Sequence, residues 1–391
     1  MEQTPGKKKK ILHTTTRLVF GGGVEKNIYY TIAGLKDEFE FHLSCGADYK
    51  DDLFIHHPEI KIIPCKDLIN KISFIKDIKA LWFYYRLIKK EKYDIVHTHE
   101  TKASFITKLA AWLAGCPYII YGLHGVTFND PMSSFKRKFY ILLEKSTIHC
   151  ADLIISVGYN TIEAYHKEDI GKNIPYEIVR SGIDIDEYLK QMIGDANEKK
   201  LFRQSLGIAE NDFVIINVGR FSFSKAQRFT IQAFAILKKK YHNLKLLLIG
   251  EGELLTTCKT LVKDLNIDKE SIVFLNYQQH VPKFLSVSDV FMFTSLREGL
   301  PRVIVEASLV QLPVVTFLVE GANEVLEHEK TGFIVEQGNV ETLVYYTEQL
   351  ILHPELRETF GKLARKHVIE HWDMRLMTGR LREIYNRNTK Q

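Results

Sequence analysis

The sequence lacks the features that define several classes of protein. Its 391 residues contain no run of about 18 apolar residues, the length that a membrane-spanning helix needs. Its five cysteines lie far apart and show neither metal-ligand nor redox spacing, which is typical of buried thiols in a reduced cytoplasmic protein. Residues 7–10 are basic, but residues 11–16 continue as a strand pattern and not as a signal-peptide core. No solenoid-length repeat is present.

A strong basic bias is also missing, and the weak one that exists lies in one half of the chain. Lys and Arg number 26 against 21 Asp and Glu in residues 1–180, and 27 against 27 in residues 181–391. The whole net charge of +5 therefore belongs to the first half. Nucleic-acid-binding proteins usually show a stronger bias or a recognisable module, so no nucleic-acid partner is expected. An anionic membrane surface or a lipid-phosphate acceptor suits a basic face of this size better.

Short apolar strands alternate with longer amphipathic helices along the whole chain. This alternation predicts an α/β protein with parallel sheets, and the length suits two domains. The strands predicted for the first domain are residues 10–15, 39–45, 60–64, 95–98, 118–123 and 153–157. Those predicted for the second are residues 213–218, 244–249, 272–275, 290–294 and 314–317. Residues 183–197 are expected to link the domains, and residues 372–387 have a helical pattern.

The most informative segment is residues 295–307, Ser-Leu-Arg-Glu-Gly-Leu-Pro-Arg-Val-Ile-Val-Glu-Ala. It places Glu298 and Glu306 eight residues apart, on either side of a Gly-Leu-Pro turn. A strand pattern precedes it, and Pro301 suits the first position of a helix. Glu298 is therefore predicted at the carboxyl end of a strand, where open α/β sheets bind ligands. The free backbone N–H groups of the turn and the positive helix end suit an anion such as a diphosphate.

Other polar residues also follow predicted strands. Arg220 and Lys225 combine a guanidinium with a mobile ammonium, which suits a diphosphate leaving group. His124 follows the strand at residues 118–123, where an imidazole can hydrogen-bond a sugar hydroxyl. His97 and His99 share one face of a strand, but no third ligand lies nearby in the sequence, so no metal site is predicted. Each of these residues alone is compatible with an ordinary solvated or buried side chain.

The paired-glutamate segment closely resembles the signature of the retaining, GT-B type glycosyltransferases of family four. Further motifs match that family in order along nearly the whole chain: Gly22-Gly23, Asp94-Ile-Val-His-Thr-His99, Leu123-His124-Gly125, Gly219-Arg220 followed by Lys225, Gly250-Glu-Gly252, and Tyr277 after a strand. Two positions depart from the pattern. Ala226 stands where the family usually has Gly or Asn, and Ser181 stands where it has Asn.

The resemblance implies a GT-B fold, with two doubly wound Rossmann-like domains that face each other across a cleft. Residues 1–182 would form the acceptor-side domain, residues 183–371 the nucleotide-sugar-binding domain, and residues 372–391 a helix that crosses back to the first domain. It also implies transfer of a hexosyl or N-acetylhexosaminyl group from a nucleotide-sugar, with UDP favoured, to a hydroxyl of a glycan or lipid-linked acceptor. No metal or other cofactor is expected. Bacterial surface polysaccharide (O-antigen or capsule) synthesis is the expected setting, in the cytoplasm or on the inner face of the plasma membrane.

The family's residue roles carry over to matching positions. Glu298 and His124 would be the catalytic residues: Glu298 would bind the donor sugar and steady positive charge in the transition state, and His124 would position that sugar. Glu306 would hold the ribose hydroxyls. The remaining donor-binding positions are Gly22, Gly23, Arg220, Lys225, Gly252, Tyr277, Gly299, Leu300 and Pro301. Two alternatives stay open: a non-hydrolysing nucleotide-sugar epimerase of the same fold, and an inactive relative that serves as a scaffold subunit.

Two segments of the basic half mix cationic and aromatic side chains. Residues 71–92 form a basic amphipathic helix pattern, and residues 133–145 form a second basic and aromatic patch. Such patterns occur at membrane surfaces. The competing interpretation is a surface helix whose apolar face packs on the sheet of its own domain.

Overall fold

The computed structural model describes residues 8–18, 22–47, 49, 54, 59–129 and 132–387. The chain divides into two compact units. The first unit is Met1–Ile183 together with Met374–Gln391, and the second is Asp184–Asp373. The chain therefore leaves the first unit once, at Ile183, and returns to it after Asp373.

The first unit is built on a parallel sheet in the order β3-β2-β1-β4-β5-β6-β7. Its strands are β1 (Lys10–Thr15), β2 (Glu40–Cys45), β3 (Lys61–Pro64), β4 (Ile95–His99), β5 (Tyr118–Leu123), β6 (Leu153–Ser156) and β7 (Tyr176–Ile178). The first six coincide within a residue or so with the predicted strands. The sequence did not predict β7, because its three residues are too few to show a pattern.

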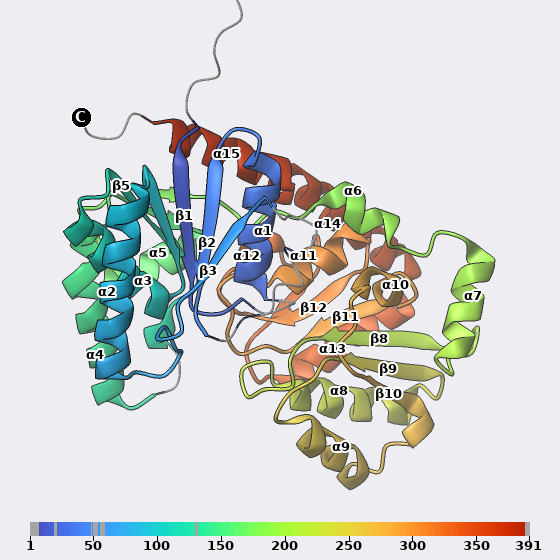
Figure 1. The fold of residues 1–391 in the computed structure, drawn as a ribbon. Helices are drawn as coiled ribbons and strands as arrows, with labels where there is room; N and C mark the ends of the chain where they lie inside the picture. The colour runs from blue at the N-terminus through green and yellow to red at the C-terminus, as the bar shows by residue number, and fades with distance from the viewer. Residues whose placement is uncertain are drawn as a thin grey trace, which may run out of the picture. The chain divides into compact units, whose positions relative to one another are not determined.

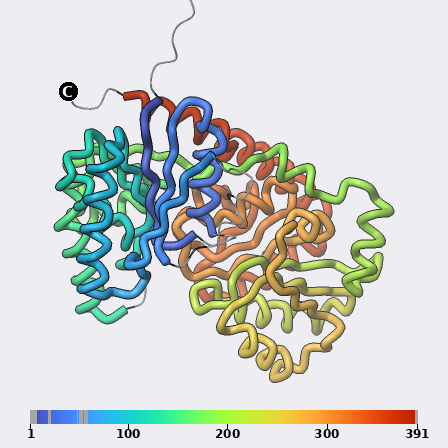
Figure 2. Tube along the Cα trace, in the orientation of Figure 1, coloured from blue at the N-terminus to red at the C-terminus, as the bar shows by residue number. Residues whose placement is uncertain are grey.

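Helices cover the sheet of the first unit. They are α1 (Gly23–Leu35), α2 (Phe74–Glu91), α3 (Thr101–Ala114), α4 (Ser134–Thr147), α5 (Tyr159–Lys167) and α15 (Met374–Asn386). α2 packs on α3, and α3 packs on α4 (Figure 1). The end of the chain, α15, lies against α1 near the beginning, as the red and blue segments of Figure 2 show.

α15 belongs to the core of the first unit and is not an appendage. Its side chains Met377, Leu381, Ile384 and Tyr385 repeat at intervals of three to four residues, which places them on one face of the helix. All four are buried in the same cluster as the apolar residues of α1. The helical pattern predicted over residues 372–387 corresponds to α15, which begins two residues later, because α14 (Pro354–Trp372) ends at Trp372 and Asp373 is extended.

The second unit contains a parallel sheet in the order β10-β9-β8-β11-β12-β13. Its strands are β8 (Phe213–Val218), β9 (Leu244–Ile249), β10 (Ile272–Leu275), β11 (Val290–Phe293), β12 (Val314–Phe317) and β13 (Phe333–Val335). The first five correspond to predicted strands, and the short β13 was not predicted. The order reverses between β8 and β11, so the loops after these two strands lie at the switch point where such sheets bind ligands.

The second unit is completed by helices. They are α6 (Ile185–Lys190), α7 (Ala196–Ser205), α8 (Gln227–Lys240), α9 (Leu255–Asp264), α10 (Val281–Leu285), α11 (Arg302–Leu309), α12 (Ala322–Val325), α13 (Val340–Leu352) and α14. Residues 183–197, predicted as the linker, contain α6 and the beginning of α7. Among the described helices, none has both the length and the apolar composition of a transmembrane helix.

Candidate active site

The carboxyl ends of β8, β9 and β10 are tied together by their backbones. The Gly219 N–H donates to the Ile249 carbonyl at 2.9 Å, and the Gly250 N–H donates to the Leu275 carbonyl at 3.0 Å. One step further, the Phe221 N–H donates to the Glu251 carbonyl at 2.8 Å. The turns after these strands therefore form one continuous surface at the edge of the sheet.

Glycine is required in the turn after β9. Gly252 has a φ of +153°, and a Cβ on it would lie 2.3 Å from the carbonyl oxygen of Phe221. Gly250 has a φ of +144°, and a Cβ on it would lie 2.2 Å from the carbonyl oxygen of Gly219. Any side chain here would push the Arg220 turn away, so the Gly-x-Gly motif shapes the site through close backbone approach.

Arg220 lies exposed on this surface, with its guanidinium 3.2 Å from the Glu253 carboxylate. The Gln227 side chain fixes the backbone of this turn, because its amide donates to the carbonyls of Gly219 at 3.2 Å and Arg220 at 3.0 Å. Gln227 is buried at the start of α8. The sequence analysis missed this positioning role, because the residue carries no charge and belongs to none of the recognised motifs.

The departure at Ala226 has a conformational explanation. Its backbone is left-handed, with φ +47° and ψ +44°, directly before α8. Glycine and asparagine adopt this conformation more readily than alanine does, which accounts for the residues that the family usually has there. The alanine adopts it nevertheless, with its side chain buried.

Lys225 and Glu298 form an ion pair. The Lys225 ammonium also lies 5.4 Å from the centre of the Phe293 ring, and its stem lies against Gly219. The loops that carry the pair are joined, because the Leu296 N–H donates to the Ser224 carbonyl at 2.7 Å. A cation suited to phosphate and a carboxylate suited to a sugar are thus direct neighbours at the switch point.

The Gly299-Leu300-Pro301 turn is packed against the loop after β12. Gly321 has a φ of +77°, and a Cβ on it would lie 2.9 Å from the Gly299 carbonyl oxygen and 3.2 Å from the Leu300 Cα. The prediction that Pro301 is the first helical residue was wrong by one position. α11 begins at Arg302, because the Arg302 N–H first closes a tight turn onto the Leu300 carbonyl at 2.9 Å.

Glu306 is buried within the second turn of α11, and its carboxylate lies 3.4 Å from Nε of Arg302. Tyr277 follows β10 and lies near Glu306. Burial raises the pKa of the Tyr277 hydroxyl, and the negative charge of Glu306 raises it further. The Tyr277 N–H lies 3.4 Å from the Glu251 carboxylate. The second unit therefore gathers most of its predicted donor-binding residues at the carboxyl edge of one sheet.

Two predicted donor-binding residues of the first unit begin α1. Gly22 precedes the helix, and a Cβ on it would lie 1.8 Å from the carboxylate of the buried Glu25, so this position accommodates no larger residue without a shift of Glu25. A Cβ on Gly23 would meet nothing within 4 Å. The third glycine of the motif, Gly21, lies outside the described residues.

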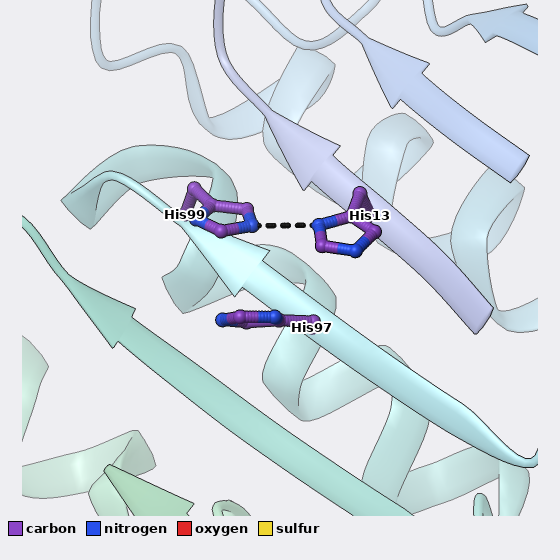
Figure 3. Close-up of side chains that lie close together, drawn as sticks. All are labelled: His13, His97 and His99. Atoms are coloured by element: carbon purple, nitrogen blue, oxygen red, sulfur yellow. Dashed lines mark hydrogen bonds between the residues drawn. The ribbon is translucent and has the colours of Figure 1, made fainter. Parts of the chain in front are cut away.

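His124 directly follows β5 and is the last imidazole of a buried group. Its Nε2 lies 2.8 Å from Nδ1 of His99, and Nε2 of His99 lies 2.9 Å from Nδ1 of His13 (Figure 3 shows the second contact). His97, on the same strand as His99, contacts the Tyr385 hydroxyl at 2.7 Å through Nδ1. Burial lowers the pKa of His124 to about 4 and that of His13 to about 3, so both are neutral at pH 7.

The register of the sheet brings together three imidazoles that the sequence keeps apart. β1 pairs with β4 so that His13 lies opposite His97, and His99 lies two residues along on the same face (Figure 3). One ring nitrogen from each lies within 4.8 Å of the others, a spacing at which a metal ion is conceivable. The third imidazole, His13, lies 84 residues before His97 in the sequence. The lack of a third ligand nearby in the sequence was therefore not a sufficient reason to exclude a metal site.

Comparison with known proteins agrees with the geometry. A family model described as Glycosyl transferases group 1 matches residues 198–367, and one described as Glycosyltransferase Family 4 matches residues 21–187. The chain is a GT-B glycosyltransferase of family four. The glycosyltransferase is 27% identical over 366 residues to the Escherichia coli UDP-Gal:alpha-D-GlcNAc-diphosphoundecaprenol alpha-1,3-galactosyltransferase, with 89% of each chain covered.

Two further proteins illustrate the likeness. The glycosyltransferase is 29% identical over 343 residues to CapM of Staphylococcus aureus, a capsular polysaccharide biosynthesis glycosyltransferase, with 84% of this chain and 85% of CapM covered. Its fold matches the crystal structure of Anabaena HepE in complex with UDP-glucose with a TM-score of 0.80, at 22% identity, with 96% and 98% of the two chains covered. The predicted fold class is thereby confirmed.

Proposed function

We propose that this glycosyltransferase moves a sugar from a UDP-sugar to a hydroxyl of a lipid-linked glycan, with retention of the anomeric configuration. The observation that carries the proposal is the Lys225–Glu298 ion pair at the switch point of the second sheet, close to the start of α11. A nucleoside diphosphate sugar presents two phosphates and a sugar, which match a cation, a helix N-terminus and a carboxylate in one place.

Each residue has a role that its position supports. Arg220 and Lys225 would neutralise the diphosphate as the bond between the anomeric carbon and its phosphate oxygen breaks. Glu298, whose side chain is only 11% exposed, would stabilise the positive charge that develops on the donor sugar. Glu306 would accept hydrogen bonds from the ribose hydroxyls. The acceptor oxygen would form the new bond to the anomeric carbon, and its proton would pass to the departing diphosphate.

The donor and acceptor classes are argued from the relatives together with the site. The E. coli relative is named for a UDP-sugar donor and a diphosphoundecaprenol acceptor, and CapM is named for capsular polysaccharide synthesis. Assembly of a bacterial surface polysaccharide or glycolipid is therefore the proposed setting. We propose that the reaction needs no bound metal, since Arg220 and Lys225 supply the positive charge that a divalent cation otherwise brings to a diphosphate.

The proposal is tested first by thermal shift of the purified protein with UDP, GDP, ADP and their common sugar conjugates, with and without magnesium. A ligand that binds the native state raises the melting temperature, and we expect the UDP series to do so without magnesium. Transfer to a diphosphoundecaprenol-linked sugar is then measured by mass spectrometry. The NMR coupling of the anomeric proton in the product shows whether the configuration is retained. Stabilisation by GDP or ADP alone would refute the UDP assignment.

We further propose that the first unit contacts an anionic membrane surface on the cytoplasmic side through α2 and α4. Only Ala80, Tyr84 and Ile88 of α2 are buried. The competing interpretation, that the apolar face of this helix packs on its own domain, therefore accounts for one narrow stripe of the helix and not for its other apolar residues. Its first turns leave Phe74 79% and Ile75 69% exposed. On α4, Phe135 and Leu142 are also exposed. Five lysines and one arginine lie near these apolar residues in the sequence: Lys71, Lys76, Lys79, Lys136, Arg137 and Lys138. Apolar insertion combined with positive charge fits anionic lipid headgroups.

Flotation with vesicles tests this contact. We expect binding to vesicles that contain phosphatidylglycerol, weaker binding at high salt, and little binding to phosphatidylcholine alone. Phe74→Ser combined with Ile75→Ser should abolish flotation, whereas the equally exposed Leu201→Ser on α7 should not change it. Equal flotation of all these proteins, or none with anionic vesicles, would reject the surface.

A further inference from the structure

Four histidines and one tyrosine of the first unit form a hydrogen-bonded chain. It runs from His124 to His99 at 2.8 Å, to His13 at 2.9 Å, to the Tyr385 hydroxyl at 3.4 Å and to His97 at 2.7 Å. The ends of this chain differ. His97 is buried, and its Nε2 has no partner within the described part of the protein. His124 is half-buried, and no hydrogen bond to its Nδ1 is found among the described residues.

The number of protons in the chain is fixed by its chemistry. Burial lowers the pKa of His97 and His99 well below the ordinary value, as it does for His13 and His124, so all four rings are neutral at pH 7. Each neutral ring carries one N–H, and Tyr385 carries one O–H. These five groups make four contacts, and each contact uses one proton. One proton is therefore left over. It resides at one end of the chain, since a Tyr385 hydroxyl turned away from both rings would be a buried donor for which the described residues provide no acceptor.

The buried end is the unfavourable place for that proton. An N–H group without an acceptor costs more in a protein interior than an unpaired acceptor lone pair, and such orphaned donors are rare. With a bare Nε2 at His97, every donor in the chain is oriented the same way. His97 Nδ1–H donates to Tyr385, Tyr385 to Nε2 of His13, and the Nδ1–H groups of His13 and His99 to Nε2 of the next ring.

We propose that this chain fixes His124 as a hydrogen-bond donor through Nδ1–H, and that His99, His13, Tyr385 and His97 are positioning residues for it. The inference rests on the proposed function and deepens it, because the ligand group at His124 must then be an oxygen acceptor, such as a hydroxyl of the donor sugar. His124 is therefore not the base that takes the proton from the hydroxyl of the acceptor substrate. Its Nδ1 becomes a base only if the four histidines and Tyr385 all reverse the direction of their hydrogen bonds together.

The same chain of hydrogen bonds disfavours a metal ion between His13, His97 and His99. Zinc needs a deprotonated lone pair from each ligand at about 2.0–2.1 Å. His13 and His99 direct the relevant nitrogens at each other, as the dashed line in Figure 3 shows, and His97 uses Nδ1 for Tyr385. Only Nε2 of His97 is unused. An ion would have to break hydrogen bonds that are already made.

Ring tautomers are read directly by nitrogen NMR. In protein labelled with ¹⁵N in the imidazole rings, the long-range ring correlations distinguish Nδ1–H from Nε2–H, and single substitutions assign the signals. We expect all four histidines as the Nδ1–H form, whereas imidazole in water prefers Nε2–H. Nε2–H at all four, or a charged ring at pH 7, would overturn the proposal. Displacement of the His13, His97 and His99 signals by one equivalent of Zn²⁺ would also overturn it, in favour of a metal site.

A pair of variants at His99 separates positioning from folding. His99→Gln keeps an amide that can accept from His13 and donate to His124, whereas His99→Leu can do neither. We expect His124 to change to Nε2–H and kcat/KM for transfer to fall about tenfold or more in His99→Leu, with both properties largely restored in His99→Gln. Equal kcat/KM in the two variants would reject the positioning role. The NMR result stands whether or not transfer is detected, so failure of the proposed function and failure of the proton order give different outcomes.

Discussion

At the scale of single residues, the candidate site depends on a few charged side chains whose surroundings fix their roles. Glu298 is nearly buried beside Lys225, whereas Arg220 stands in solvent 3.2 Å from Glu253. A carboxylate shielded from water acts more strongly on a nearby developing charge than an exposed one does. We therefore expect the two residues to fail in different ways when they are replaced.

Replacing Glu298 by glutamine removes the charge and keeps the shape. We expect Glu298→Gln to lower kcat by about 100-fold or more, as removal of a preorganised electrostatic group commonly does. Nucleotide affinity should stay within about threefold, since the carboxylate acts on the sugar and not on the diphosphate. Steady-state transfer assays and calorimetry with UDP measure the two effects. Glu341→Gln, exposed at the start of α13, is the matched control, and near-normal turnover of Glu298→Gln would disprove the assigned role.

Arg220 is expected to act on binding and rate together. Loss of one charge-assisted hydrogen bond corresponds to roughly a tenfold weaker Kd for UDP in Arg220→Ala. Arg220→Lys should recover only part of this affinity, because an ammonium cannot replace the planar guanidinium fork. Lys239→Ala, which removes an exposed cation from α8 of the same unit, controls for net charge. Unchanged UDP affinity in Arg220→Ala would exclude this residue from the diphosphate site.

At the scale of elements, the sequence predicted strands well and the contacts between helices poorly. Residues 118–123 and 213–218 are strands with the predicted bounds, because a short apolar run bounded by turns is a local signal. The contact of α3 with α4 includes the fully buried Lys108, whose ammonium lies 3.5 Å from the Glu144 carboxylate and 3.7 Å from the centre of the Tyr121 ring. Nothing in the local sequence distinguishes this lysine from a solvated one.

Breaking this buried pair from one side should be costly. We expect Glu144→Leu to lower the free energy of unfolding by about 3–5 kcal/mol, since it leaves the Lys108 charge buried without its carboxylate. Combining it with Lys108→Met should restore most of the loss, because an apolar pair of similar volume needs no compensation. Urea unfolding measures both variants. A loss below about 1 kcal/mol in the single variant would show that Lys108 is neutral or solvated in the native protein.

At the scale of the whole molecule, the buried histidines make stability depend on pH. Burial lowers the native pKa of His13 to about 3 and that of His124 to about 4, whereas the unfolded values lie near 6.5. Between these limits the unfolded chain binds more protons than the native protein. The contribution to stability is therefore complete above about pH 6.5 and is lost as the pH falls toward 4.

We expect the free energy of unfolding to fall by about 1 kcal/mol per pH unit for each of these histidines between pH 6 and pH 5. Urea titrations at several pH values measure the slope. His13→Gln should reduce this slope by the contribution of one histidine. His242→Gln, which alters an exposed residue, should leave the slope unchanged. A slope that is the same in the native protein and in His13→Gln would show that His13 is not held neutral.

The sequence by itself determined the two parallel sheets, the turns after their strands and the paired glutamates that point to the family. These features depend on residues within about twenty positions of one another, where periodicity, glycines and turn chemistry leave a readable pattern. Only the tertiary structure decided that Lys225 meets Glu298, that His13 joins His97 and His99, and that α15 completes the core of the first unit. Such contacts follow from the way distant segments are brought together in the fold. Between β1 and β4, for example, a slip of one residue in register would point His97 and His99 to the opposite face of the sheet.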